Sequence, residues 1–325
     1  MAGTQRIAIL SDVHYAGPSE RQRGNNYEYR DLNSRLQKAL CRCYRHFIWL
    51  RDPVNQGHLL DQFLERSGDL NHVFALGDYN CDTGFIGVSD DASLESAKEC
   101  LGKLRARFGN GLHALIGDHE LGKLPLFGTR GGLRFESWRR VRQELELASF
   151  WQFELGPFTC IGITSTLVAL PAFQADMIDR ERPDWEHTRE QHMEEIRTGF
   201  GSVATGKRIL LFCHDPTALP YLLNEPAVRN RLPQIEQTFI GHLHSPLFLW
   251  KSRRLAGMPA ISFLGPTVQR HSTALRQAGQ WKPFKLLLCP SLAGIQLLKD
   301  GGFYTAEIRG HEGAPLQPKF HRIRR

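Results

Sequence analysis

The sequence lacks a paired cysteine framework, a low-complexity tract and an apolar run long enough to cross a bilayer. Its seven cysteines are odd in number and form no C-x-x-C pair, which favours reduced thiols over a disulfide-stapled secreted module. The longest apolar region, from Leu286 to Leu298, is interrupted by Pro290. The first residues lead directly into a short apolar run, without the long apolar core of a signal peptide. We therefore expect a cytoplasmic protein.

The composition is that of an ordinary globular protein. With 325 residues, 41% hydrophobic and 23% charged, the chain is neither a disordered, a collagen-like nor a coiled-coil sequence. The net charge of +7 favours anionic partners, such as phosphates, nucleic acid or acidic membrane, without choosing among them. Because no repeat or linker divides the chain, we expect one domain over residues 1–312, followed by a frayed basic tail over residues 313–325.

Five short apolar runs are each followed at once by polar residues that can bind metals. The runs are Arg6–Leu10, His72–Leu76, Leu112–Ile116, Arg208–Cys213 and Thr238–Ile240. The polar residues that follow them are, in the same order, Asp12 and His14; Asp78; Asp118 and His119; His214; and His242 and His244. Runs of this length predict buried strands, and ligands collect beyond the carboxyl ends of such strands. The pattern therefore predicts one site at one edge of the sheets.

Helical periodicity separates these strands. Apolar residues recur every three or four positions over 32–47, 94–108 and 135–145. Residues from about 27 to 66 look like an insertion larger than catalysis needs, and they carry basic and aromatic side chains, among them Arg45, Phe47 and Trp49. Such a helix could bind a lipid headgroup, but we favour the reading in which one side of it is core. Further strand-like runs are Phe158–Ile163, Ala260–Leu264, Gly294–Leu298 and Phe303–Ile308.

The residue types and their spacing suit a pair of metal ions. In extended chain, residues two apart share a face, so Asp12 and His14 can converge on one ion, while His242 and His244 can each address one of two ions. Carboxylate oxygens and neutral imidazoles suit Mn, Fe or Zn, whereas a thiolate-rich set would indicate another site. We therefore expect two divalent cations as cofactors, with manganese as one of the candidate metals.

The five elements together resemble the calcineurin-like metallophosphoesterase superfamily, whose pattern is D-x-H, G-D, G-N-H-[DE], H and G-H-x-H. The resemblance extends from Ile7 to about Pro246. It implies an α/β fold, a four-layer α-β-β-α sandwich, with the helical insertion between the first two motifs. It also implies that one metal is held by Asp12, His14, Asp78 and His244, and the other by Asp78, Asp118, His214 and His242. Asp78 would bridge the metals, and His119 would sit beside the scissile phosphate as a catalytic residue.

One motif departs from the family pattern, because Asp118 stands where the family carries Asn. Its oxygen can still bind a metal. Two dications and three carboxylates, however, leave a net charge of about +1 instead of +2, so we expect the site to attract a dianionic phosphate less strongly.

The loops beyond the strand ends are the expected substrate selectors. Arg21 and Arg23 could grip a phosphate or remain solvated loop charges. Asn80 lies just past Asp78, and Arg130 lies in a glycine-rich stretch that could close over a substrate.

These features predict a dimetal phosphoesterase that cleaves a phosphomonoester, phosphodiester or pyrophosphate bond of a small or lipid-linked substrate by attack of a metal-bridging hydroxide. The alternatives are a pyrophosphatase of the UDP-diacylglucosamine type at the inner face of the membrane, a nuclease, and a non-catalytic scaffold of the same fold. Contact with an anionic membrane would be peripheral. A nucleic-acid partner is less favoured because the positive charge is scattered along the chain.

Overall fold

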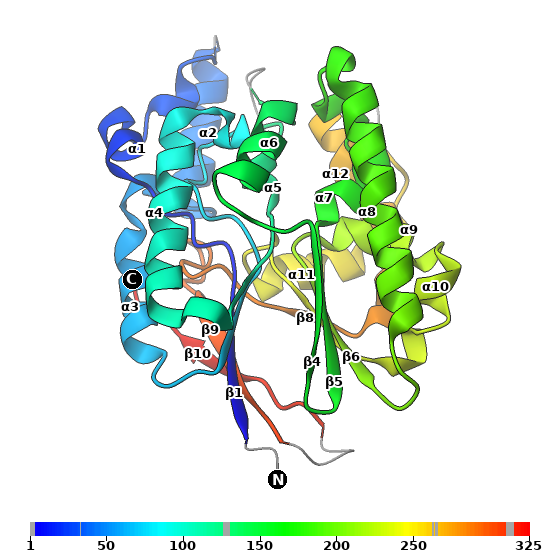
Figure 1. Cartoon of the computed structure of the whole chain (residues 1–325). Coiled ribbons are helices and arrows are strands. Elements are labelled where there is room, and N and C mark those ends of the chain that lie inside the picture. Colours follow the sequence, from blue (N-terminus) through cyan, green and yellow to red (C-terminus); the bar gives the residue numbers. More distant parts are fainter. Residues whose placement is uncertain (1–3, 33, 126–130, 262, 264–265, 310–314) are drawn as a thin grey trace.

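The computed structural model describes residues 4–32, 34–125, 131–261, 263, 266–309 and 315–325. Two five-stranded sheets lie face to face, with the strand orders β10-β9-β1-β2-β3 and β4-β5-β6-β7-β8 (Figure 1). The strands are β1 (Gln5–Leu10), β2 (His72–Ala75), β3 (Leu112–Ala114), β4 (Phe150–Leu155), β5 (Phe158–Ile163), β6 (Arg208–Cys213), β7 (Ile235–Ile240), β8 (Leu286–Leu288), β9 (Gly302–Ile308) and β10 (Lys319–Arg322).

Both sheets are parallel where they deliver the motif residues. Strands β1, β2 and β3 run parallel, as do β5, β6, β7 and β8. Antiparallel pairing occurs outside these strands: β4 pairs with β5 at one edge of the second sheet, and β9 lies between β1 and the edge strand β10 in the first. The carboxyl ends of the central strands therefore point to the same end of the molecule, which is the upper end in Figure 1.

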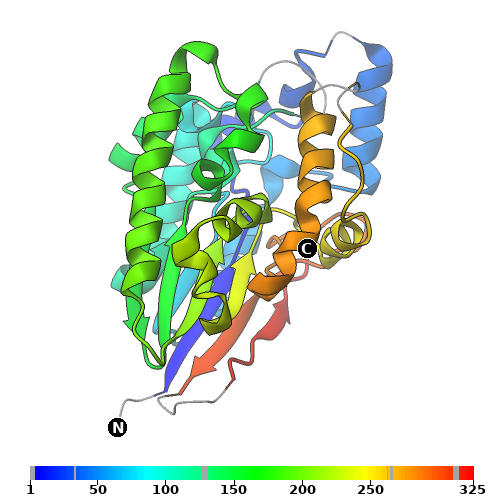
Figure 2. The same cartoon turned by 90° about the vertical axis from the view of Figure 1, so that its right-hand side faces the viewer.

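Helices cover the outer face of each sheet. In Figure 1 the helices α1 to α4 lie outside the first sheet and α7 to α10 outside the second, and Figure 2 shows the same layers turned by 90°. The helices are α1 (Pro18–Arg23), α2 (Arg35–Phe47), α3 (Gly57–Arg66), α4 (Asp91–Phe108), α5 (Asp118–Leu121), α6 (Phe135–Gln143), α7 (Ser165–Val168), α8 (Arg182–Ser202), α9 (Leu219–Leu223), α10 (Pro226–Arg229), α11 (Pro246–Arg254) and α12 (Pro266–Gln277). This confirms the predicted four-layer α-β-β-α sandwich.

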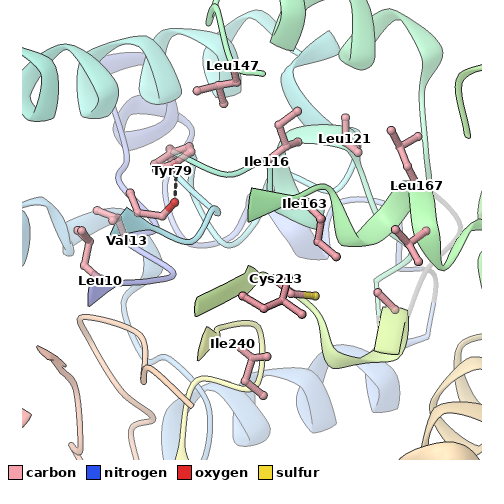
Figure 3. Packing of buried hydrophobic residues seen from close by; sticks show 14 of the residues in the cluster. Leu10, Val13, Tyr79, Ile116, Leu121, Leu147, Ile163, Leu167, Cys213 and Ile240 are labelled. Atoms are coloured by element: carbon pink, nitrogen blue, oxygen red, sulfur yellow. Dashed lines mark hydrogen bonds between the residues drawn. The ribbon is translucent and has the colours of Figure 1, made fainter. Parts of the chain in front are cut away.

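Alternation along the strands builds two apolar layers. Ile9 and Phe74 pack between the two sheets with Phe212, whose ring stacks on Phe74 at a centroid distance of 4.1 Å. Their neighbours in sequence point outward, to the helices. Figure 3 shows part of this outer layer near the strand ends, where Leu10 and Tyr79 lie among the buried side chains. The strands are buried on both faces, which explains why they appear in the sequence as continuous apolar runs.

Three expectations about local structure are wrong. The last residues are not a frayed tail, because Lys319–Arg322 pairs antiparallel with β9 and Ile323 is buried. Gly294–Leu298 contains no strand. Of the run Ala260–Leu264, residues 262 and 264 lie outside the described residues and the others form no strand.

The prediction that one side of the insertion helix belongs to the core is also wrong. A helix forms over Arg35–Phe47, but Leu36 and Phe47 are 68% and 63% exposed, so these periodic residues are not core. The rest of the insertion does pack against the sheet side, since α3 buries Leu59, Leu60 and Phe63. The boundaries predicted for the domain and its insertion stay predictions.

Candidate metal centre

All the motif residues lie at the carboxyl ends of strands, as their order in the sequence predicts. Asp12 and His14 follow β1, Asp78 follows β2, and His214 follows β6. Asp118 and His119 begin the short helix α5 after β3, and His242 and His244 follow β7. Residues separated by more than 200 positions in the chain are thereby brought into contact, such as His14 and His244.

The first group of candidate ligands is wholly buried. It comprises Asp12, His14, Asp78 and His244, whose ligand atoms all lie within 4.8 Å of one another. The Nε2 atoms of His14 and His244 are 3.1 Å apart, and Nε2 of His244 lies 3.2 Å from Oδ1 of Asp12. Two imidazole nitrogens that face each other next to a carboxylate are arranged as ligands of a shared cation.

The second group lies beside the first. It contains Asp118, His214 and His242, whose ligand atoms likewise lie within 4.8 Å. Oδ1 of Asp118 is 3.2 Å from Nε2 of His214 and 3.4 Å from Nδ1 of His242. Oδ2 of Asp78 lies 3.3 Å from Nε2 of His214 and 3.9 Å from Nε2 of His14, which places the Asp78 carboxylate between the two groups.

These residues fit a pair of divalent metal ions. Oδ2 of Asp78 and Nδ1 of His242 are buried without a hydrogen-bond partner among the described residues. The other ring nitrogens of two ligands face backbone carbonyls: Nδ1 of His214 is 2.8 Å from the oxygen of Leu76, and Nδ1 of His14 is 3.3 Å from that of Asn80. Such contacts fix the tautomer in which Nε2 keeps its lone pair for a metal. The mixed oxygen and nitrogen set suits Mn, Fe or Zn.

Buried charges of opposite sign compensate one another in this cluster. Burial raises the pKa of Asp12, but the attraction of His244 and the other imidazoles outweighs burial and lowers it. Burial lowers the pKa of His214, but the facing carboxylates of Asp78 and Asp118 raise it well above its usual value. The buried carboxylates therefore need compensating positive charge, which metal ions can supply in place of protons.

The backbone at the ligands adopts a conformation that few residues other than glycine take. Asp12, His14, Asp78, His242 and His244 have φ between 48° and 61°, in the left-handed region. Only eight non-glycine residues of the described ranges have such values, so the ligand loops concentrate local strain. Strain of this kind persists where surrounding contacts fix the chain, as at functional sites.

Glycines before the ligands permit close approach of the loops. A Cβ on Gly77, whose φ is 113°, would lie 2.6 Å from the backbone of Gly117. A Cβ on Gly241 would collide with the hydroxyl of Ser11. The G-D and G-H steps of the motifs thus have a steric reason.

His119 lies in the centre but outside both groups described above. Its two ring nitrogens are buried without a hydrogen-bond partner among the described residues, and its ring packs edge-on against that of His14 at 4.9 Å. Burial, together with the charge of Lys123, lowers the pKa of His119 to about 3. The imidazole is therefore neutral at pH 7 until an anion approaches it.

Acidic residues next to the ligands orient the loops. Glu120 accepts hydrogen bonds from the backbone N–H groups of Asp78, Tyr79 and Gly117. Asp215 accepts from the N–H of Thr217, and its Oδ2 lies 3.7 Å from Nε2 of His242.

Asp118 has a partner that the sequence did not indicate. Nζ of Lys123 lies 3.3 Å from its Oδ2. The charges of Lys123 and His242, together with the hydrogen bond between His214 and Asp118, outweigh burial and hold the pKa of Asp118 well below its usual value. The additional negative charge expected where the family has Asn is therefore offset by a lysine five residues further along the chain.

The insertion also contributes side chains to the centre. Trp49 donates from Nε1 to Oδ1 of Asp82 at 3.2 Å, and its ring lies over that of His244 at 4.3 Å. Arg45 forms ion pairs with Asp82 and with Glu28. Oδ1 of Asp82 is in turn 3.8 Å from Nε2 of His14 and from Nε2 of His119.

The predicted substrate residues are only partly brought to the centre. Asn80 is buried there, and its amide donates to the backbone oxygen of His119 at 3.2 Å. Arg21 donates to the oxygen of Ala16, and Arg23 forms an ion pair with Asp90, so the described contacts of both arginines are to other parts of the chain. Arg130 lies outside the described residues.

A cavity of about 410 Å³ opens beside the second group. Its lining reaches Asp82, Lys123 and His242 of the centre.

The described residues contain no helix with the length and apolar character to span a membrane.

No protein-family model and no curated protein matches this chain. Solved structures do match it at low identity. A metallophosphoesterase from Sphaerobacter thermophilus is 13% identical, with a TM-score of 0.36 over 99% of this chain and 89% of that one. The phosphopantetheinyl hydrolase of Mycobacterium tuberculosis is 12% identical, with a TM-score of 0.34 over 76% and 85%.

The purple acid phosphatase of yellow lupin (Lupinus luteus) seeds is 12% identical, with a TM-score of 0.37 over 75% of this chain and 38% of that one. This chain therefore spans well under half of the lupin enzyme. At these identities the likeness concerns the fold alone.

Proposed function

We propose that this chain is a dimetal-dependent phosphoesterase of the calcineurin-like type, which hydrolyses a phosphoester or phosphoanhydride bond. The observation that carries the proposal is the position of the Asp78 carboxylate between two groups of buried ligands. A bridging carboxylate lowers the repulsion between two dications, and such a pair recurs in enzymes of phosphoryl transfer.

The ligand residues would hold the two ions as the motifs imply: Asp12, His14, Asp78 and His244 hold one, and Asp78, Asp118, His214 and His242 the other. When bound, the ions supply Lewis-acid polarisation of the phosphate and activation of water. Asp78 and Glu120 keep the loops in register, since Oδ1 of Asp78 accepts from the N–H of His119 at 3.0 Å. His119 is thereby placed to donate from its ring to the phosphate or to the leaving oxygen.

Approach of a phosphate changes the proton balance of His119. An adjacent dianion favours the charged imidazolium and raises the pKa of His119 from its low value in the buried site. Asp82, 3.8 Å from Nε2 of His119, adds to this attraction. Lys123 opposes it, but the same lysine offsets the charge of Asp118 and so restores the attraction of the site for a dianion.

The test is hydrolysis of p-nitrophenyl phosphate and bis-p-nitrophenyl phosphate after loading with Mn²⁺, Ni²⁺, Mg²⁺ or Zn²⁺. We expect turnover with at least one metal. His119→Gln should lower kcat by roughly 100- to 10,000-fold, without changing the metal content, because it removes a proton donor but no ligand. His187→Gln, at an exposed position on α8, is the matched control. Absence of turnover with every metal would favour the scaffold alternative.

We further propose peripheral contact with anionic lipid through α2. This helix exposes Leu36, Leu40 and Phe47, beside the basic side chains of Lys38 and Arg42. An apolar stripe flanked by cations is typical of helices that lie on a membrane surface. Sedimentation with vesicles of anionic and of neutral lipid tests this. Indifference to anionic lipid would remove the proposal, and Leu36→Ser with Phe47→Ser should weaken the binding.

A further inference from the structure

The cavity beside the second ligand group is lined mainly by apolar side chains. The aromatic and aliphatic residues that define its wall include Leu32, Tyr44, Trp49, Phe248, Leu275 and Trp281. They come from the insertion, from α11 and from the segment after residue 265, so parts of the chain far apart in sequence enclose one space. A volume of about 410 Å³ lies in the range of sites that enclose small molecules.

Polar side chains of the metal centre form part of this wall, beside others such as Glu28 and Lys251. Asp82, Lys123 and His242 belong to the metal centre and also line the cavity. The indole N–H of Trp281, at another part of the lining, is buried without a hydrogen-bond partner among the described residues. A substrate whose phosphate lies at the centre would therefore extend its other part into the apolar cavity, where the indole N–H of Trp281 can donate a hydrogen bond.

From this arrangement we infer the substrate class: an amphiphilic phosphoester whose apolar alkyl or aryl group fills the cavity. The inference rests on the proposed function, because it places the phosphate at the metal centre. The wall does not suit a nucleic-acid backbone, which needs cations along its path. Of the four Lys and Arg side chains at the wall, Arg45, Lys123 and Arg270 already pair with acidic residues of this chain, and Lys251 lies over the ring of Phe248.

The experiment uses p-nitrophenyl alkyl phosphodiesters of increasing alkyl length, from methyl to octyl. In each, the oxygen of water forms the new P–O bond, the bond to p-nitrophenolate breaks, and an alkyl phosphate remains, while the released protons go to solvent. Each buried methylene should raise kcat/KM by at most roughly fourfold. We expect a gain of at least about 100-fold from methyl to octyl. A gain within about threefold would overturn the inference.

A variant that fills the cavity sharpens the test. Ala274 lines it from α12, and Ala274→Trp should reduce the octyl-to-methyl ratio of kcat/KM to below about tenfold. Arg276→Trp, at an exposed position on the same helix, should leave the ratio unchanged. An unchanged ratio in Ala274→Trp would contradict this placement of the alkyl group.

A binding measurement serves if Ala274→Trp fails to fold. Octylphosphonate should bind the metal-loaded wild-type protein at least about tenfold more tightly than methylphosphonate, as measured by calorimetry. Equal affinities would overturn the inference. Failure of the proposed function is distinguishable, because it abolishes hydrolysis of the methyl ester as well as the octyl ester.

Discussion

The two groups of candidate ligands differ in what surrounds them. The first group is completely enclosed, and the insertion closes it from outside with Trp49 over the ring of His244. The second opens to the cavity, since the side chain of His242 is 19% exposed, and it contains the extra carboxylate of Asp118 with its lysine. The enclosed first group thus suits retention of an ion, and the open second group suits contact with a substrate that enters and leaves.

This difference assigns separate roles to the two halves of one centre. Enclosure strengthens electrostatic attraction because water is excluded. Exposure of the second group beside an apolar cavity would give a substrate access to the ion proposed there. The Asp78 carboxylate lies between the two groups, so it couples the two halves of the centre.

The largest effect should follow from removing the carboxylate that both groups share. Asp78→Asn should lower kcat/KM by at least about 1,000-fold, because the loss of a charged bridge removes several kcal/mol of stabilisation. Metal content, measured by plasma mass spectrometry, should fall below two per chain. Asp61→Asn, at an exposed position on α3, is the control. Two tightly held metals in Asp78→Asn would contradict the bridging role.

A second prediction concerns the support behind the first group. Glu20 accepts from the N–H of Cys81, in the loop that follows Asp78, and burial raises the pKa of Glu20 from 4.5 to about 7. The folded state therefore binds the proton more tightly than the unfolded state does. Stability contributed in this way is full below pH 4.5 and is lost as the pH rises to about 7.

Glu20→Gln should remove this loss of stability with rising pH. Between pH 5 and pH 8 the free energy of unfolding of the wild type should fall by up to about 3 kcal/mol more than that of the variant. Urea unfolding at both pH values measures the difference. Glu65→Gln, at an exposed position on α3, controls for charge. Equal pH dependence of wild type and Glu20→Gln would show that Glu20 ionises normally.

The smallest effect concerns the pair that distinguishes the second group. Lys123→Met should weaken inhibition by inorganic phosphate by roughly tenfold, because it leaves the carboxylate of Asp118 uncompensated. Asp118→Asn in the same background should restore much of the binding, since it removes the unpaired charge. Metal affinity by calorimetry gives a second readout. Additive effects of the two substitutions would mean that the lysine and the carboxylate are not coupled.

The sequence predicts the strand-end centre well because every ligand follows a strand within a few residues. The register of a few residues after Leu10, Leu76 or Ile240 is local, so the side chains meet wherever parallel strands end together. The left-handed backbone at five of the ligands is a consequence of loop packing and has no such local signal.

Contacts that depend on tertiary packing escaped the sequence analysis. Trp49 and Arg45 reach the centre only because the insertion folds back over the strand ends. Lys123 follows a motif and could have been found as the nearest cation to Asp118, had the additional carboxylate prompted a search for one. The exposure of Leu36 and Phe47 depends on which side of α2 faces the centre, and apolar periodicity alone does not decide this.

The most direct measurement of the central claim is anomalous diffraction from crystals of the wild-type protein soaked in Mn²⁺. We predict two peaks about 3.5–4 Å apart, one on each side of the Asp78 carboxylate. The four side chains of the enclosed group should surround one peak, and the ligands beside the cavity should surround the other. A single peak, or manganese bound only elsewhere on the protein, would contradict the account.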